Sequence, residues 1–169
     1  MQPLKIETYQ DALRGLSDQR FLNSQKYQEQ QGRANRKGAH PAIVQFERRL
    51  VKHMAKLGVP LFAHCVVRDQ DEQARVFAEG FSQAKFGQSA HNFGMAVDII
   101  HSRKAWELTE REWQLIGHAG LAIVAPALGV KVNWGGDDKA ILGKDDKFRW
   151  DPAHWELVGW KGIREDYPW

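Results

Sequence analysis

The sequence is organised around Gln88–Ile100, QSAHNFGMAVDII, which places a histidine and a carboxylate seven positions apart with a glycine between them. Gly94 and the residues before it predict a loop, whereas Met95–Ile100 alternates and runs apolar like a strand. We therefore expect His91 on a loop that enters the strand and Asp98 inside the strand. Both are candidate ligands of one metal ion, provided that a third ligand comes from elsewhere in the chain.

The composition is that of one ordinary domain. The chain has 169 residues, of which 43% are hydrophobic and 27% charged, so it can bury a core without help from a metal. No apolar run approaches the roughly 20 residues of a membrane span, which argues against an integral membrane protein. The first residues lack the basic and then apolar pattern of a secretory signal, so we expect the chain to be made and held in the cytoplasm.

Cysteine and charge narrow the kinds of site that are possible. The single cysteine, Cys65, excludes an internal disulfide and a zinc site built from several cysteines, so metal ligands should be histidines and carboxylates. The formal net charge of +3 suits a polyanionic surface such as nucleic acid or bacterial cell wall, and does not choose between them. The basic cluster Arg33, Arg36 and Lys37 is more typical of a solvated loop than of a binding site.

Hydrophobic periodicity predicts a single domain of α+β class, with a central antiparallel sheet flanked by helices. Helices are expected around residues 9–16, 41–57, 69–79 and 109–128. The last of them begins at a capping box of Thr109 and Glu112 and should kink or end at Pro126. Strands are expected at residues 61–67, 95–100, 130–134 and 154–158. Residues 1–40 are interpreted as a helical and loop extension of unknown role, and residues 41–160 as the catalytic core.

His154 is the candidate third ligand, because it lies in the segment DPAHWEL with an acid, Asp151, three residues before it. Two imidazoles and one carboxylate leave a zinc ion an open fourth position, where the pKa of a bound water falls to about 7. Asp151 can then accept a proton as the water attacks a carbonyl, and pass it to the leaving amine. His101, at a strand end, remains a minor candidate ligand. The other histidines are interpreted as packing, loop or surface residues, namely His40, His53, His64 and His118.

Four segments resemble one family. SAHNFGMAVD, residues 89–98, matches the SxHxxGxAxD pattern of the zinc peptidoglycan peptidases, which include the D-alanyl-D-alanine carboxypeptidases and dipeptidases of vancomycin resistance and the phage L-alanyl-D-glutamate endolysins. DPAHWE, residues 151–156, resembles their second motif, and VNWGGDD, residues 132–138, resembles the WGGDW loop of the endolysin branch. VVRDQDEQARVFAEG, residues 66–80, resembles a family stretch in which an arginine precedes a glutamine-bearing helix. The resemblance covers about residues 60–160.

The resemblance implies roles for individual residues. His91, Asp98 and His154 would bind one zinc ion at the edge of the sheet of a hedgehog and D,D-peptidase-like fold, with Asp151 as the general base. Arg68 would hold the developing oxyanion or a substrate carboxylate, since its planar fork offers two donors. The remaining family positions would line or support the substrate groove, namely Gln73, Ser89, Trp134, Gly135, Gly136 and Asp137.

The sequence therefore predicts a monomeric zinc peptidase that cleaves peptidoglycan stem peptides, most like an L-alanyl-D-glutamate endopeptidase. A phage enzyme of this kind would reach the wall through a membrane pore formed by a separate protein, and a host wall-remodelling enzyme is the other setting. The alternatives are a D-alanyl-D-alanine carboxypeptidase and a non-catalytic zinc-containing wall-binding module, as in the hedgehog signalling domain. Binding to nucleic acid has only the charge in its favour. Asp138 departs from the family pattern, because the endolysin loop has tryptophan there.

Overall fold

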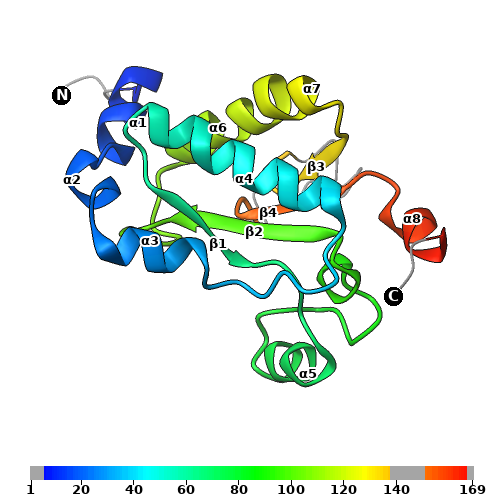
Figure 1. Cartoon of the computed structure of the whole chain (residues 1–169). Coiled ribbons are helices and arrows are strands. Elements are labelled where there is room, and N and C mark those ends of the chain that lie inside the picture. Colours follow the sequence, from blue (N-terminus) through cyan, green and yellow to red (C-terminus); the bar gives the residue numbers. More distant parts are fainter. Residues whose placement is uncertain (1–5, 138–150, 167–169) are drawn as a thin grey trace.

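A computed structural model of the chain describes residues 6–137 and 151–166. Its centre is a four-stranded antiparallel sheet in the order β1-β2-β4-β3 (Figure 1), which confirms the predicted α+β class. The strands are β1 (Leu61–Cys65), β2 (Ala96–His101), β3 (Val132–Trp134) and β4 (His154–Leu157). Asp138, the departure from the family loop, lies outside the described residues.

Helices precede, connect and follow the strands. They are α1 (Tyr9–Leu16), α2 (Gln19–Leu22), α3 (Gln25–Gln31), α4 (Pro41–Lys56), α5 (Gln70–Ala78), the 3-10 helix η1 (Ala90–Phe93), α6 (Glu110–His118), the π-helix η2 (Ala119–Val124), α7 (Ala125–Leu128) and α8 (Trp160–Asp166). The helices predicted near α1, α4, α5 and α6 are confirmed. The short helices α2 and α3 were not predicted, although each begins at a side-chain cap, from Asp18 and Ser24. None of the helices in the described ranges is long and apolar enough to span a membrane.

The predicted helix at residues 109–128 is present with a change of winding. Its capping box of Thr109 and Glu112 forms as expected. The chain then passes from α6 into the π-helix η2 and on into α7, whose first turn holds Pro126. Because proline has no N–H and its ring clashes with the carbonyl four residues earlier, a wider turn before it is a physical means of continuing the helix.

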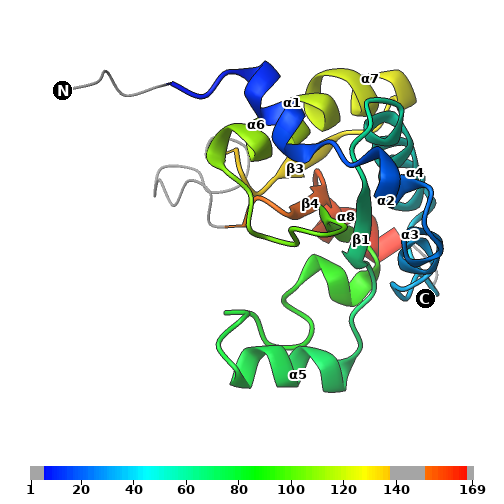
Figure 2. The same ribbon diagram turned by 90° about the vertical axis from the view of Figure 1, so that its left-hand side faces the viewer.

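The two faces of the sheet are covered differently. Helix α4 lies on one face, where Phe46 meets Trp155 of β4 with ring centroids 4.9 Å apart. Helix α5 lies on the opposite side, below the sheet in Figure 1, and Figure 2 shows the gap in helical cover between it and the strands. The core is therefore on the α4 side, where Phe46, Leu50, Met54 and Trp155 are fully buried. Burial of such side chains stabilises the fold by about 1.5–3 kcal/mol each.

Strand register decides which side chains face away from α4. Val97 of β2 pairs with Trp155 of β4, whereas Asp98 pairs with His154 and Ala96 with Glu156. Because paired residues in an antiparallel sheet share a face and successive residues alternate, Asp98, His154 and Glu156 all project from the face opposite Trp155. The face that carries little helical cover is thus the one that carries polar side chains.

The N-terminal segment packs on the same core as the rest of the chain. Leu16 of α1 is fully buried, and Ala34 belongs to the same cluster of buried side chains. Gln31 donates to the Leu61 carbonyl oxygen at 3.1 Å, and Gln30 donates to the Ser102 carbonyl oxygen at 3.0 Å. Residues from Ile6 to about Gly32 therefore brace β1 and the turn after β2, which gives the extension a structural part in the fold.

Candidate metal centre

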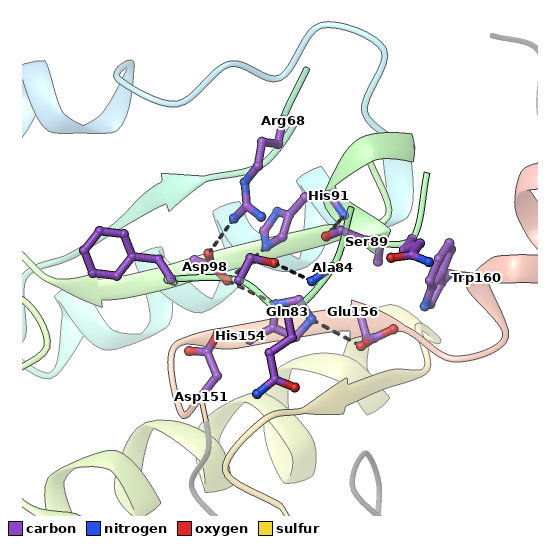
Figure 3. A pocket seen from close by; sticks show the side chains of 14 residues that line it. Arg68, Gln83, Ala84, Ser89, His91, Asp98, Asp151, His154, Glu156 and Trp160 are labelled. Carbon is purple, nitrogen blue, oxygen red and sulfur yellow. Dashed lines mark hydrogen bonds and ion pairs between the residues drawn. The ribbon is translucent and has the colours of Figure 1, made fainter. Parts of the chain in front are cut away.

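The structure brings together the four residues that the two sequence motifs single out. Asp98 Oδ1 lies 3.1 Å from His91 Nε2 and 3.1 Å from His154 Nδ1. The carboxylate of Asp151 lies beside Asp98 and His154, within the distance that one ion can bridge. Figure 3 shows the four side chains converging on one cavity from η1, β2 and the start of β4. Three candidate ligands and a neighbouring acid, up to 63 positions apart in the sequence, meet on the open face of the sheet.

The loop before β2 fixes His91 by local hydrogen bonds. Ser89 caps η1, accepting from the His91 backbone N–H at 3.3 Å, and the Asn92 side chain accepts from the Ser89 N–H at 3.2 Å. Gly94 ends η1 with a φ of +65°, and a Cβ there would lie 2.6 Å from Ala39 Cα. Glycine is therefore required at Gly94 for both conformation and space, and the predicted loop into the strand is a capped 3-10 helix.

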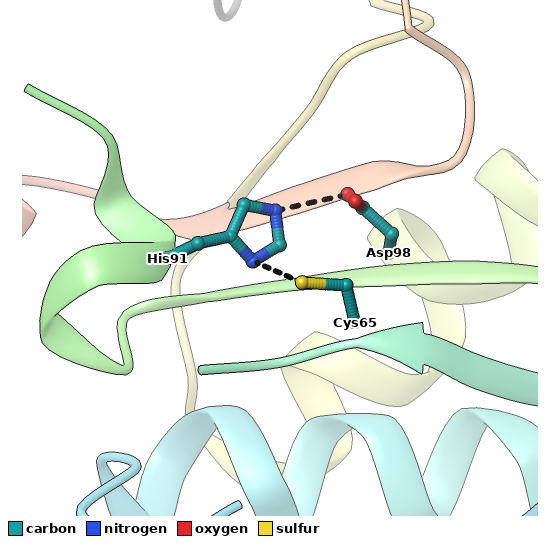
Figure 4. Close-up of side chains that lie close together, drawn as sticks. All are labelled: Cys65, His91 and Asp98. Atoms are coloured by element: carbon teal, nitrogen blue, oxygen red, sulfur yellow. Dashed lines mark hydrogen bonds and ion pairs between the residues drawn. The ribbon is translucent and has the colours of Figure 1, made fainter. Parts of the chain in front are cut away.

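The hydrogen-bond partner of His91 on the side away from Asp98 determines which ring nitrogen is free for a metal. Its Nδ1 lies 2.8 Å from the Val66 carbonyl oxygen and 3.6 Å from Cys65 Sγ (Figure 4). A carbonyl oxygen only accepts, so Nδ1 carries the proton and Nε2 presents its lone pair toward Asp98. Cys65 is buried as predicted, and its contact with His91 was not anticipated.

His154 is held in the same manner by a residue that the sequence interpretation missed. Its Nε2 lies 3.2 Å from Glu156 Oε1, and its Nδ1 faces Asp98. Glu156 stands two positions after His154 in β4, so both project from the same face of the strand. A carboxylate behind a ligand histidine fixes the tautomer and increases the basicity of the ligand nitrogen. The sequence signal for Glu156 was its position in DPAHWE, two residues after His154, because alternate residues of a strand project from the same face.

The set of donors fits a divalent cation. With the outer nitrogens of His91 and His154 engaged, both inner nitrogens point lone pairs at the same carboxylate oxygen, an arrangement that requires positive charge between them. Although burial lowers the pKa of His154, its hydrogen bonds to Asp98 and Glu156 raise it to about 9. Burial likewise opposes the charge on His91, and the carboxylate of Asp98 nevertheless holds the pKa of that ring well above its usual range. Both pKa shifts show that the place between the two rings and Asp98 favours positive charge, which a divalent cation would supply.

A second grouping of possible ligands shares two of these residues. Cys65, His91 and Asp98 also lie close enough together to meet one ion. However, Cys65 and Asp98 lie on opposite sides of the imidazole ring in Figure 4, and the nitrogen toward Cys65 is engaged by the Val66 carbonyl. An imidazole nitrogen that donates to a carbonyl has no lone pair for a metal, so the geometry favours His154 over Cys65 as the third ligand.

Asp151 has the environment of a proton carrier. Burial, reinforced by the negative charge of Asp98, raises the pKa of Asp151 to about 6. It is partly exposed and lines the cavity, whereas the pKa of Asp98 itself lies well below its usual range because the two imidazoles outweigh the effect of burial. Two carboxyl groups with widely separated pKa values fit the separate tasks of metal ligand and general base.

Arg68 reaches the site from the segment after β1. Its Nη2 lies 3.8 Å from Asp98 Oδ2, and its Nη1 donates to Gln73 Oε1 at 3.0 Å. Gln73 also accepts from the Asn92 side chain at 3.1 Å and donates to the Ala84 carbonyl at 2.6 Å. Gln73 is fully buried and holds Arg68 and the loop around Ala84 in place, as a residue that supports the pocket would.

The predicted groove residues of the WGGD segment occupy a different place. Trp134 is only 7% exposed, stacks on Trp155 with ring centroids 5.8 Å apart, and donates to the Pro152 carbonyl oxygen at 2.7 Å. It pairs with Trp155 in the register of β3 and β4, which turns it away from His154 and toward the core. The structure therefore places Trp134 in the core, on the side of the sheet away from the cavity, and its contact with a substrate stays a prediction.

Gly135 acts by close approach. Its N–H donates to the His154 carbonyl at 2.8 Å, and a Cβ would overlap the Asp151 carbonyl oxygen. Gly135 is buried and lets the backbone that bears Asp151 and His154 pack closely, whereas a Cβ on the buried Gly136 would overlap the Trp134 ring. Asp137 is partly buried, and its contact with a substrate stays a prediction.

The cavity at the centre has a volume of about 350 Å³. Ser89, predicted to belong to the pocket, lines it together with Arg68, the four converging residues and the loop at 81–84. The minor candidate ligand His101 is elsewhere, buried and donating to the Leu16 carbonyl at 2.8 Å.

Three solved structures share this fold. The L-Ala D-Glu endopeptidase ChiX of Serratia marcescens is 24% identical, with 75% of this chain and 87% of its own covered and a TM-score of 0.55. A mutant of the vancomycin resistance D,D-pentapeptidase VanY in complex with Zn(II) is 16% identical, with a TM-score of 0.51. The match covers 76% of this chain and 78% of the VanY chain. The LdcB LD-carboxypeptidase, which recognises peptidoglycan, is 22% identical, with a TM-score of 0.50. The match covers 76% of this chain and 72% of the LdcB chain.

No protein-family model matches the chain. At these identities the likeness shows the fold alone. That fold is the one implied by the motif resemblance, and one of the three neighbours carries zinc.

Proposed function

We propose that this protein, which has the fold of the zinc peptidoglycan peptidases, is itself a zinc-dependent peptidase that cleaves peptidoglycan stem peptides. The observation that carries the proposal is the convergence of His91, His154 and Asp98, with Asp98 Oδ1 3.1 Å from a nitrogen of each ring, beside the acid Asp151. The finer proposal is an L-alanyl-D-glutamate endopeptidase, supported by the aspartate base and the WGGD segment that resemble the endolysin branch.

His91, Asp98 and His154 would hold one zinc ion through Nε2, a carboxylate oxygen and Nδ1. A zinc ion with such ligands lowers the pKa of a bound water and polarises a carbonyl oxygen. Val66 and Glu156 keep the outer ring nitrogens protonated, so that both histidines offer lone pairs inward. Asp98, on the rigid central strand β2, holds the two rings toward one point.

Asp151 would act as the general base and then as the general acid. A carboxyl group with a pKa of about 6 can take a proton from an attacking water and return it to a leaving amine near neutral pH. Its place beside Asp98 and His154 puts it next to the open side of the ligand set. The nearby positive charge of a bound metal would favour the ionised form, which is the form that accepts a proton.

Arg68 would stabilise the negative charge that develops on the carbonyl oxygen. The guanidinium is only partly buried and faces the cavity, while its Nη1 is held by Gln73. Donors that are fixed before the reaction stabilise a transition state at no cost of reorganisation. The side chain that anchors Arg68 is itself fully buried, so the position of the cation is determined by the fold.

The test uses purified cell walls and defined stem peptides. We expect the wall suspension to clear with the zinc-loaded protein, and we expect chelation or Asp151→Asn to reduce the rate at least about a hundredfold. Restoring zinc should restore the wild-type rate and leave Asp151→Asn inactive. Exposed Asp71→Asn on α5 is the matched control. Full activity of the stripped protein or of Asp151→Asn would overturn the mechanism.

Mass spectrometry of the products separates the alternatives. A cut between L-Ala and D-Glu supports the endopeptidase, whereas release of a lone D-Ala identifies a carboxypeptidase, which the same fold and site accommodate. A protein that binds zinc and walls and releases no fragment would be a binding module. The acid beside the ligand set argues against that outcome, because a binding site gains nothing from a partly buried carboxyl with a raised pKa.

We propose that the enzyme is made in the cytoplasm as a monomer and reaches the wall through a pore formed by a separate protein, as in phage lysis. The resemblance of its motifs to the endolysin branch supports this. Co-expression with and without a pore-forming protein tests it, since lysis that is independent of the pore would contradict it.

A further inference from the structure

The cleft at the metal centre has two arms. The first arm is the cavity of about 350 Å³ described above, which runs toward Gln88, Glu156 and Trp160. The second arm has a volume of about 570 Å³ and runs toward His64, Arg75, Val76 and Trp106. Both arms are lined by Arg68, Phe81, Asp98 and Asp151. Three residues with proposed chemical roles, Arg68, Asp98 and Asp151, thus stand at the junction of the two arms, and none of the proposed roles requires the second arm.

A β-bulge directs His64 into the second arm. Ala63 pairs with Ile99, and Cys65 pairs with Asp98, so that His64 is an extra residue between two register pairs. Its side chain is exposed although the strand around it is buried. Bulges next to active sites re-aim individual side chains. Here the bulge sends Cys65 to the back of His91 and His64 toward the cleft.

A tight turn after β2 presents Trp106 to the same space. Ala105 has a φ of +53° and exchanges backbone hydrogen bonds with His101, at 2.9 and 3.4 Å. The buried His101 ring supports the turn, since its Nδ1 accepts from the N–H groups of Arg103 and Lys104. A left-handed conformation at a non-glycine residue costs on the order of 1 kcal/mol and persists only where its surroundings impose it.

The N-terminal helices and α6 brace this turn. Arg103 Nη1 donates to Asp18 Oδ2 at 2.8 Å, and Lys104 Nζ lies 3.3 Å from Glu112 Oε2. The braced turn holds Trp106 with its ring edge to face with His64, at 4.8 Å between centroids and 78° between planes. Trp106 nevertheless remains 47% exposed, and Phe81 at the junction of the arms is 79% exposed. A rigidly supported aromatic surface left open to water beside a catalytic cleft is typical of a binding site.

We infer that the second arm is a substrate subsite, in which Trp106 and His64 hold the part of the peptide that continues beyond the bond that is cut. The inference rests on the proposed function and adds that the substrate is held on both sides of the metal centre. The two aromatic rings suit methyl and methylene groups of a peptide residue. A cleft with space on both sides favours internal cleavage over removal of a terminal residue.

The experiment compares one stem peptide that has residues on both sides of the cut bond with two shorter versions, one trimmed at each end. We expect Trp106→Ala to lower kcat/KM on the full peptide about tenfold, mainly through KM, and His64→Ala to lower it less. For one of the two trimmed peptides, the kcat/KM of the wild type should fall by a similar factor. The kcat/KM of Trp106→Ala should not fall further on that peptide, because the substitution and the trimming remove the same contact. Trp106→Phe should recover most of the loss.

Ile123→Ala is the matched control, because Ile123 is also half exposed, at 44%, and lies on η2 away from the cleft. Circular dichroism checks that each variant is folded. Equal loss on all three peptides, or no loss on any, would overturn the subsite. A wild-type protein that cuts none of the peptides would contradict the proposed function instead. Calorimetry of the full peptide with wild type and Trp106→Ala then decides the subsite by itself, equal affinities overturning it.

Discussion

The two faces of strands β2 and β4 have opposite tasks although they are built from alternate residues of the same segments. On the α4 face, Val97 and Trp155 are both fully buried in apolar surroundings. On the other face, their neighbours Asp98, His154 and Glu156 form a polar chain around the candidate metal centre. One set of hydrogen-bonded pairs in the sheet therefore positions both the core and the site.

The comparison shows that the strand register links stability to chemistry. A slip of one residue would bring Trp155 into the cleft and His154 into the core, because side chains alternate with a period of two. The large apolar side chains on the α4 face thus oppose any register that misplaces the ligands. Substitutions on the two faces should separate cleanly, with losses of metal and activity on one and losses of stability on the other.

The largest effect is expected from Asp98→Asn on the polar face. The variant removes the charge on which His91 and His154 converge, so we expect it to lose stoichiometric zinc and to lower activity by about a thousandfold. Its shape is unchanged and the histidines can release their protons, so the protein should remain folded at neutral pH. Metal analysis after gel filtration and wall-clearing rates measure the two losses. A variant that keeps one zinc per chain would refute the assigned ligand set.

A smaller effect on the same face is expected from Glu156→Gln. Glutamine keeps the size of the side chain and removes the negative charge behind His154 Nε2, where Glu156 Oε1 lies at 3.2 Å. Such outer partners of ligand histidines change metal affinity about 10–100-fold. Competition with a chelator measures the affinity, and exposed Glu29→Gln is the control. An unchanged zinc affinity would mean that Glu156 only lies near the site.

Residues of the site could be predicted where the chemistry depends on side-chain identity at a fixed spacing. His91, Asp98, His154 and Asp151 stand in two short motifs, and the structure places them together. Arg68 also reaches the cavity as predicted. What the sequence could not show is how the chain closes around them, because that depends on long-range pairing. Two examples are the bulge that turns His64 outward and the hydrogen bonds of the buried Gln73 side chain. Both arise from contacts between segments that are distant in the sequence.

The fold was predictable to a similar extent. The strands and the longer helices follow from periodicity and caps, as at Thr109 and Glu112. The short helices α2, α3 and α8 were missed because about one or two turns give too little periodicity to detect. Trp134 was assigned to the groove because the segment around it resembles a family loop. Its true side of the sheet is set by the pairing of β3 with β4, which no local pattern specifies.

The smallest effect is therefore expected on the α4 face, from Trp134→Phe. Phenylalanine keeps a ring stacked on Trp155 and loses the hydrogen bond from Trp134 Nε1 to the Pro152 carbonyl, which is 2.7 Å long. We expect the free energy of unfolding to fall by about 1–2 kcal/mol, because a partly buried carbonyl loses its donor. The KM for stem peptides should stay within about twofold of wild type, since the indole does not face the cleft. Denaturant unfolding and steady-state kinetics measure the two quantities. A raised KM with unchanged stability would return Trp134 to the substrate groove, and would show that the division of labour between the two faces does not extend to β3.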